Sequence, residues 1–186
     1  MTLSIYRGGA HPFLSYMLPN INHILYLTDL SKHAAYVFRY ALRLAKTFDA
    51  KISILHVVKR IDPAMEVPIL VHLGEEAYQK LIAEKEHEII DGLKQRLREF
   101  AERELQGDPE SEDRVAAILV HEGDPVSDIL ETANELDADL VVMGDHSKGV
   151  LAHTFLGSTA ERVLRHIRRP VLVVPIPSKS VDDISV

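Results

Sequence analysis

The chain has 186 residues, a size that fits one domain, and it carries a net charge of −7 with 46% hydrophobic and 26% charged residues. This charge makes nucleic acid and an anionic membrane surface poor first candidates for a partner. The sequence contains no cysteine, so disulfides, thiolate chemistry and zinc–thiolate or iron–sulfur sites are excluded. The lack of cysteine fits a cytoplasmic protein, and no apolar run approaches the ~20 residues needed to span a bilayer.

The first 20 residues do not have the pattern of a signal peptide, because arginine, glycine, histidine and proline interrupt any apolar stretch. We expect 1–20 to form an N-terminal extension that is flexible or packed on a partner. A single domain is expected over 21–177, followed by a polar C-terminal tail, 178–186.

Short apolar segments alternate with segments of helical periodicity along the rest of the chain. Strands are expected at 23–28, 51–58, 114–123, 139–144 and 170–175. Helices are expected at 32–48, at 75–105, from 125 onward and at 158–168. A loop over 59–73 and a solvated turn over 106–113 complete the pattern, because both contain proline and lack an apolar period.

Two of these helices carry start signals in the sequence. Ser31 is placed as the N-cap of the first helix, and Asp124 followed by Pro125 marks the start of the third. The long helix is expected to bury one face along its length, formed by Tyr78, Ile82, Ile89, Leu93, Leu97 and Phe100.

The alternation of strands and helices indicates the fold class. The first, second, fourth and fifth strands are almost entirely apolar, which predicts an α/β fold with a five-stranded open parallel sheet and helices on both faces. Such sheets commonly have the strand order 3-2-1-4-5, with a switch point between strands one and four. Ligands bind there at the carboxyl ends of the strands, so we expect segments 28–31 and 144–149 to form the ligand rim.

The second of these segments has features of an anion site. Gly144 ends an apolar strand, and Gly157 and Ser158 open the last helix. Main-chain N–H groups at a helix start bind anions, and glycine lets the main chain approach a phosphate closely. Two other interpretations remain open: Gly144 simply ends a strand, and Ser158 with Glu161 forms a capping box that needs no ligand.

Two stretches of the sequence are similar to a known family. The stretch "MGDHSKGVLAHTFLGSTAERVLRHIRRPVLVVP" resembles the C-terminal signature of the universal stress protein family, and "YLTDLSKHAAYVFRYALRLAKTFDAKISILHVV" resembles its opening βαβ unit. The resemblance covers roughly 22–176 and implies an adenine nucleotide alpha hydrolase-like fold. ATP-binding members carry a glycine, two residues, a glycine, nine residues, and then Gly-Ser or Gly-Thr. Here Gly144 and Gly157 with Ser158 hold the outer positions, and Ser147 replaces the middle glycine.

Ser147 leaves two outcomes open. If the middle position requires a left-handed backbone conformation, a serine there costs about 1–2 kcal/mol because of its Cβ. If the position requires only a small residue with an available N–H, serine serves, and its hydroxyl adds a phosphate contact. The resemblance also implies that members without the full glycine pattern often do not bind ATP.

The resemblance further implies a set of ligand contacts. Asp29 matches the acid that contacts the adenine–ribose portion of the nucleotide, and its alternative role is a favourable charge at a helix start. Leu27 and Val57 match contacts to the base, and Met143 is placed to line the adenine pocket. Ordinary core packing is the alternative for all three. Thr159, next to the outer glycine-serine pair, offers a main-chain N–H to phosphate.

The loop between the outer glycines carries charged side chains. Lys148 can neutralise phosphate charge, and Asp145 can hold Mg²⁺ where phosphates supply the remaining ligands. For Asp145 and His153 we favour ordinary solvated side chains. We find no nucleophile–base pair and no metal-ligand spacing among the ten histidines, so the expected cofactor is ATP, with or without Mg²⁺.

The last strand, 170–175, is apolar and is expected at an edge of the sheet. An uncovered apolar edge invites pairing with another chain. We therefore expect a two-fold homodimer through this strand, with Phe155 and Leu156 near the interface.

The sequence thus predicts a cytoplasmic, ATP-binding, homodimeric universal stress protein that regulates a stress response with slow or absent hydrolysis. Its protein partner is unknown, and neither nucleic acid nor a membrane is expected. A dimeric interaction module of the same fold without nucleotide is the first alternative. A weak nucleotide hydrolase or adenylyl-transferring enzyme is the second.

Overall fold

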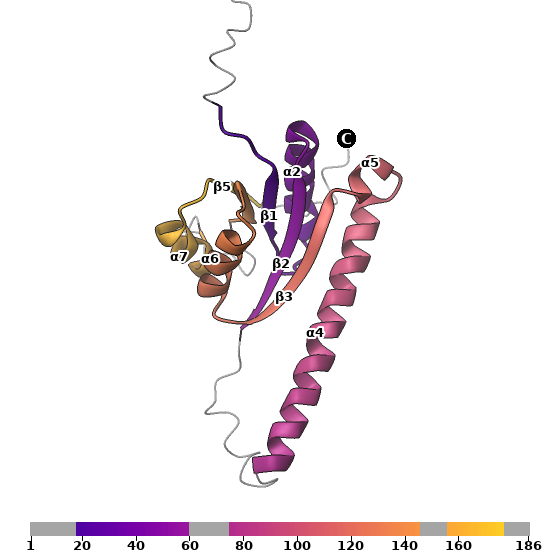
Figure 1. The fold of residues 1–186 in the computed structure, drawn as a ribbon, viewed down its shortest axis with the longest axis vertical. Helices are drawn as coiled ribbons and strands as arrows, with labels where there is room; N and C mark the ends of the chain where they lie inside the picture. Colours follow the sequence, from indigo (N-terminus) through magenta and orange to yellow (C-terminus); the bar gives the residue numbers. More distant parts are fainter. Residues whose placement is uncertain (1–17, 60–74, 146–155, 177–186) are drawn as a thin grey trace, which may run out of the picture.

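The described part of the chain is built on one parallel sheet, with helices packed against it (Figure 1). The structure, a computed structural model, describes residues 18–59, 75–145 and 156–176. The strands are β1 (His23–Leu27), β2 (Lys51–Lys59), β3 (Val115–Gly123), β4 (Leu140–Gly144) and β5 (Val171–Val174). They are ordered β3-β2-β1-β4-β5, and every neighbouring pair runs parallel. The predicted fold class, strand order and switch point are therefore confirmed.

Helices cover both faces of the sheet. They are α2 (Ala34–Phe48), α4 (Glu75–Leu105), α5 (Pro109–Glu112), α6 (Pro125–Glu135) and α7 (Ser158–His166). Buried residues of α2 and α4 join one core cluster, and those of α6 and α7 join the other. Along β1 the side chains alternate between the two, with Ile24 and Tyr26 in the first cluster and Leu25 and Leu27 in the second. Because both faces are covered, the strand is apolar at successive positions.

Three aromatic rings join β1, α2 and α4 within the first cluster. The ring of Phe38 lies with its centroid 5.2 Å from that of Tyr26 and 5.3 Å from that of Phe100. All three side chains are buried. Aromatic pairs at such distances add roughly 0.5–1.5 kcal/mol beyond the area that they bury, so these rings fix α2 and α4 against the sheet.

Helix α2 begins later than the sequence predicts. Its first residue is Ala34, and the residue at its N-cap position is His33, without a side-chain capping bond. Ser31 lies two residues before that position, although its hydroxyl accepts the N–H of His33 at 3.3 Å, as a capping side chain does. The reason lies in the preceding turn, where Leu30 adopts a left-handed conformation with φ of 57°. There the Asp29 carboxylate accepts the Ser31 N–H at 3.0 Å, so the chain completes a side-chain-held turn before the helix starts.

The predicted start of α6 is confirmed. Asp124 is the N-cap, and its Oδ1 accepts the N–H groups of Val126 and Ser127, each at 3.1 Å. Pro125 follows as the first helical residue, where its missing N–H leaves no helical bond unmade.

The long helix α4 has the predicted bounds, but its apolar face is not buried along its length. Leu97 and Phe100 are buried and Leu93 packs partly on the core, whereas 51% of Ile89 is exposed, so the prediction for Ile89 is wrong. Figure 1 shows the reason: the C-terminal part of α4 lies along β3, and its N-terminal part extends past the end of the sheet. The side chains of Tyr78 and Ile82 lie outside the described residues.

The segment predicted as a solvated turn, 106–113, contains the four-residue helix α5. Ser111 in this helix is fully buried, and its hydroxyl donates to Asp108 at 2.9 Å. Asp108 also pairs with Lys46 of α2. The prediction of a purely solvated turn is therefore wrong. The ion pair between Asp108 and Lys46 holds this turn against α2, and the local sequence pattern does not indicate that pair.

Candidate functional site

A cavity of about 390 Å³ opens at the switch point, where β1 and β4 end and α2 and α7 begin. This volume lies in the range of small-molecule sites. Eight of the ten residues predicted as ligand contacts line it: Leu27, Asp29, Val57, Met143, Gly144, Gly157, Ser158 and Thr159. The other two, Ser147 and Lys148, lie outside the described residues.

The cavity has an apolar wall. Leu27, Leu55 and Met143 are buried members of the core cluster on the α6 and α7 face, and Val57 packs partly against it. Ile129 of α6 completes this wall. Leu27, Val57 and Met143 therefore pack in the core and also line the cavity, so the two predicted roles of these residues do not exclude each other.

The β1–α2 turn supplies polar groups to the same cavity. Asp29 is exposed, and within the described ranges only its Oδ1 is engaged, by the N–H of Ser31. Tyr26 is buried at the base of the turn, and its hydroxyl donates to the Ala34 carbonyl at 2.8 Å. Burial raises the pKa of Tyr26, so its phenol stays protonated and serves to hold the start of α2.

The start of α7 differs from a capped helix. Its N-cap is Gly157, which makes no side-chain capping bond, and Glu161 pairs with Arg165 one turn later at 2.5 Å. The capping-box alternative for Ser158 is therefore wrong. Because the first N–H groups of a helix have no partner inside it, those of Ser158, Thr159 and Ala160 are left for other acceptors. All three residues line the cavity.

Asp145 joins three segments at the rim of the cavity. Its main-chain N–H donates to Val174 at 3.1 Å, and its carbonyl accepts the N–H of Gly157 at 2.7 Å. Its Oδ1 accepts the N–H of Ile176 at 3.1 Å. The prediction of an ordinary solvated side chain is thus wrong for Asp145, because its partners lie beyond β5 and at the start of α7. His153 lies outside the described residues.

Gly144 is needed for packing. A Cβ at this position would lie 3.1 Å from Cδ1 of Ile176 and 3.3 Å from Cγ2 of Val37. Its backbone does not have a positive φ. The glycine therefore lets β4 end close to α2 and to the segment after β5, at the point where the cavity opens.

Several residues that line the cavity were not predicted from the sequence, among them His33, His56, Pro125, Ile129 and Ile176. His56 follows the last residue of β2 that pairs with β1, and its Nδ1 lies 2.8 Å from the Thr28 carbonyl oxygen. The only signal for it in the sequence is its position next to Val57. His33 has a buried Nδ1 with no hydrogen-bond partner among the described residues.

Leu156, which was expected near a dimer interface, packs partly against the core cluster on the α6 and α7 face. Phe155 lies outside the described residues.

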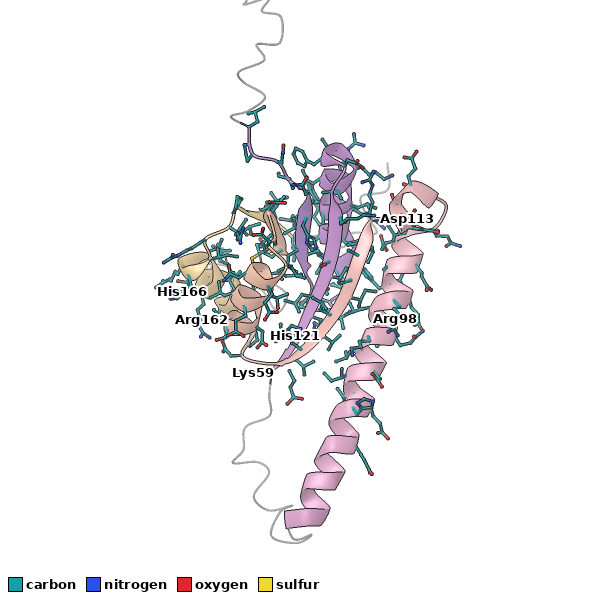
Figure 2. The ribbon with its side chains drawn as sticks, viewed as in Figure 1. Lys59, Arg98, Asp113, His121, Arg162 and His166 are labelled. Atoms are coloured by element: carbon teal, nitrogen blue, oxygen red, sulfur yellow. The ribbon has the colours of Figure 1, made fainter. Side chains whose placement is uncertain are left out.

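An ion pair joins α7 to the start of α6. Figure 2 labels Arg162 on α7. The Nη1 of Arg162 lies 3.7 Å from Oδ2 of Asp124, the N-cap of α6. Hydrogen bonds from Ser127 and the charge of Arg162 lower the pKa of Asp124.

Over the described ranges, no group of three or more acidic or histidine side chains is arranged to hold a metal ion. Within the same ranges, no helix combines the length and apolar character that crossing a membrane requires.

The strand order, the helices on both faces and the cavity at the switch point define an α/β protein with the adenine nucleotide alpha hydrolase-like fold. A solved structure of the protein MJ0577 superposes on this chain with a TM-score of 0.61 at 24% identity. The superposition covers 87% of this chain and 100% of that one. The sequence profile described as "Universal stress protein family" matches residues 20–175. The chain therefore belongs to the universal stress protein family.

Two relatives from Methanocaldococcus jannaschii support this membership. Universal stress protein MJ0531 is 30% identical over 180 residues, which cover 95% of this chain and 90% of the relative. Universal stress protein MJ0577 is 32% identical over 156 residues, which cover 81% of this chain and 93% of the relative.

Proposed function

We propose that this chain binds ATP in the cavity at the switch point and acts as a homodimeric regulator of a stress response in the cytoplasm. The observation that carries the proposal is the start of α7, where Ser158, Thr159 and Ala160 line the cavity and no side chain caps the first turn. The family's ATP-binding signature, whose outer glycines fall at Gly144 and Gly157, agrees with this use. Hydrolysis is slow or absent in this proposal.

The phosphates are assigned to the side of the cavity formed by β4 and α7. A helix start carries a partial positive charge of about +0.5, and its free N–H groups point at an approaching anion. Ser158, Thr159 and Ala160 supply these groups, and the Ser158 hydroxyl makes no capping bond that would compete. Ser147 and Lys148 enter the proposal from the sequence alone.

The adenine–ribose portion is assigned to the side formed by β1 and β2. Leu27, Val57 and Met143 offer the apolar surface that a purine base requires. Asp29 ends the first strand with one carboxylate oxygen engaged by Ser31, which leaves the other for a ribose hydroxyl. The cavity thus offers positive charge at one end and an apolar surface at the other, which matches the chemistry of a nucleotide.

Mg²⁺ fits this site as a companion of the phosphates. The ion needs only one or two carboxylates when phosphate oxygens and waters supply its other ligands. Asp145 uses Oδ1 to hold the segment after β5, so we assign the ion chiefly to the triphosphate.

The homodimer is proposed through β5, an edge strand of the described sheet. Val171, Leu172 and Val173 are half-buried in the single chain, so part of this apolar strand is available to a second copy. Pairing across a two-fold axis covers such an edge. Light scattering at micromolar concentration should give about 42 kDa, twice the 20.9 kDa of the chain. A species of chain mass overturns the dimer.

Thermal unfolding with three probes tests the nucleotide proposal: Mg-ATP, inorganic triphosphate and adenosine. A ligand that binds only the folded state at 100 times its dissociation constant stabilises that state by about 2.7 kcal/mol. We expect Mg-ATP to raise the melting temperature most, and each fragment to raise it less, because each fills one end of the cavity. If none of the three ligands changes the melting temperature at millimolar concentration, the proposal fails. The interaction module without nucleotide, in which Ser147 closes the loop, then becomes the better account.

A further inference from the structure

The part of α4 that extends past the end of the sheet carries an apolar face that the fold does not use (Figure 1). Ile89 is 51% exposed on this part of the helix, whereas Leu97 and Phe100, two and three turns later, are buried. Helices in proteins gain most of their stability by packing an amphipathic face. The projecting part of α4 therefore has a face to bury, and the described part of the chain offers no core that covers Ile89.

The sequence of this face is symmetric about the midpoint between Lys85 and Glu86. Ile82 lies three residues before Lys85, and Ile89 lies three residues after Glu86. Positions three or four residues apart share one side of a helix, so these four positions share one side of α4. A second α4 that runs antiparallel, about a two-fold axis at the midpoint, therefore places Ile82 opposite Ile89 of the partner subunit. The same axis places Lys85 opposite Glu86 of the partner subunit.

The symmetry continues outward along the helix. Tyr78 and Leu93 come four residues beyond the two isoleucines, and Glu75 and Arg96 come three residues beyond those. The same axis places Tyr78 opposite Leu93 of the partner subunit, and Glu75 opposite Arg96 of the partner subunit. Each of the four kinds of pair thus joins an apolar residue to an apolar residue, or an acid to a base. A parallel pair in register would instead place each charge opposite its own kind, which costs free energy.

The described side chains of this face are open to a second copy. Ile89 and Arg96 are exposed, and Leu93 packs only partly on the core. Helix α4 lies along β3, at one edge of the sheet, whereas β5 forms the other edge (Figure 1). A contact through α4 therefore leaves β5 free for the homodimer proposed above.

We propose that the projecting parts of two α4 helices pair antiparallel about the midpoint between Lys85 and Glu86, as a second contact between copies of this chain. The contact does not involve the cavity, so it does not rest on nucleotide binding. Interfaces that bury less than about 1,200 Å² are weak, and we expect one pair of short helical segments to fall in this class. The contact should therefore form at hundreds of micromolar protein, above the concentration at which the β5 homodimer is tested.

Light scattering at rising concentration tests the proposal with charge reversals at the centre of the pair. The average mass of the wild type should at least double between about 10 μM and about 1 mM. Lys85→Glu brings four acidic groups together at the midpoint and Glu86→Lys brings four basic groups together, so neither variant should show the increase. An equal mixture of the two variants should show it again, because opposite charges then meet at the centre.

A matched control makes the same charge change elsewhere on α4. Lys80→Glu lies on the opposite side of the helix and should behave as the wild type. At about 10 μM, where the contact is absent, all variants should melt at the wild-type temperature, which shows that they fold. A wild-type mass that does not rise overturns the proposal. It is equally overturned if the single reversals keep the increase, or if their mixture does not recover it.

Disulfide trapping tests the direction of the two helices, because the chain has no cysteine of its own. An equal mixture of Ile82→Cys and Ile89→Cys should cross-link between chains in oxidised glutathione. Neither variant should cross-link with itself, since the two copies of each position lie about 10 Å apart along an antiparallel pair, beyond the reach of a disulfide. A mixture of Lys80→Cys and Ile89→Cys measures cross-linking by random collision.

Two results of the trapping experiment overturn the proposal. One is a mixture of Ile82→Cys and Ile89→Cys that cross-links no more than the collision control. The other is self-cross-linking of each single variant, which would show a parallel pair. Failure of either test removes the α4 contact alone, because nucleotide binding and the β5 homodimer are measured separately.

Discussion

The main-chain oxygen of Asp145 accepts the main-chain N–H of Gly157 at 2.7 Å, so the chain leaving β4 and the chain entering α7 are joined at the rim of the cavity. The carboxylate of Asp145 holds the N–H of Ile176 at 3.1 Å, and Ile176 itself lines the cavity. One residue therefore positions the two outer glycines of the proposed phosphate loop and the segment that follows the edge strand.

Asp145→Ala should lower the free energy of unfolding by about 1–2 kcal/mol, because the Ile176 N–H loses a charged acceptor. Asp145→Asn keeps an oxygen acceptor at the same place and should retain most of that stability. Urea unfolding of both variants measures the difference. Equal losses in the two variants would show that the bond to Ile176 contributes little.

The glycine at the end of β4 gives a second prediction. Gly144→Ala should destabilise the fold by about 1–3 kcal/mol, because the new Cβ lies 3.1 Å from Cδ1 of Ile176. Ile176→Val removes that carbon atom, so the double variant should recover at least 0.5 kcal/mol relative to the sum of the single changes, a coupling of about the size seen for residues in contact. Strict additivity of the two changes in urea unfolding would contradict the packing argument.

The two halves of α4 should respond differently to the loss of an apolar side chain. Leu97→Ala should cost about 2–5 kcal/mol, since Leu97 is fully buried between α4 and the sheet. Ile89→Ala should stay within about 0.5 kcal/mol of the wild type, because Ile89 is largely exposed. Chemical unfolding under identical conditions compares the pair. A large loss for Ile89→Ala would indicate that another surface covers this part of the helix.

Local sequence patterns were sufficient to predict hydrogen bonds whose donor and acceptor are close together in the chain. The start of α6 is such a case, since Asp124 caps residues two and three positions ahead. The apolar pattern predicted a parallel sheet covered on both faces, and the strand order common to such open sheets then placed Gly144 at the switch point. Helix α2 starts later than predicted because the left-handed Leu30 shifts the helix start, and no periodicity signals one backbone angle.

Contacts between segments that are far apart in the sequence could not be predicted from local patterns. Asp145 meets Ile176 from 31 residues away, and His56 meets Thr28 from 28 residues away. The exposure of Ile89 depends on where β3 ends beside α4, which the spacing of apolar residues within the helix does not encode. Eight of the predicted ligand contacts nevertheless line one cavity. The switch-point argument predicted the rim segments, and the resemblance to the family supplied most of the individual residues.

The cap of α6 gives a prediction about acid. Hydrogen bonds from Ser127, together with the charge of Arg162, lower the pKa of Asp124 in the folded state below its unfolded value. A lowered pKa means that this stabilisation is fully present above about pH 4, the usual value for an aspartate, and is lost as the pH falls through the folded value. The melting temperature of wild type should thus exceed that of Asp124→Asn at pH 7, and the gap should narrow at pH 3. A gap that is the same at both pH values would contradict this cause.

The central claim is that the start of α7 holds the phosphates of ATP, and one calorimetric comparison tests it most directly. Gly157 has φ of −66° and ψ of 153°, which valine also adopts, so Gly157→Val should fold while placing a branched side chain at the phosphate end of the cavity. Ile89→Ala, far from the cavity lining, is the matched control. We predict saturable heat with Mg-ATP for the wild type and for Ile89→Ala, and at least a 10-fold weaker association for a folded Gly157→Val, equivalent to about 1.4 kcal/mol. Unchanged affinity in Gly157→Val, or no heat from the wild type at millimolar Mg-ATP, would contradict the account.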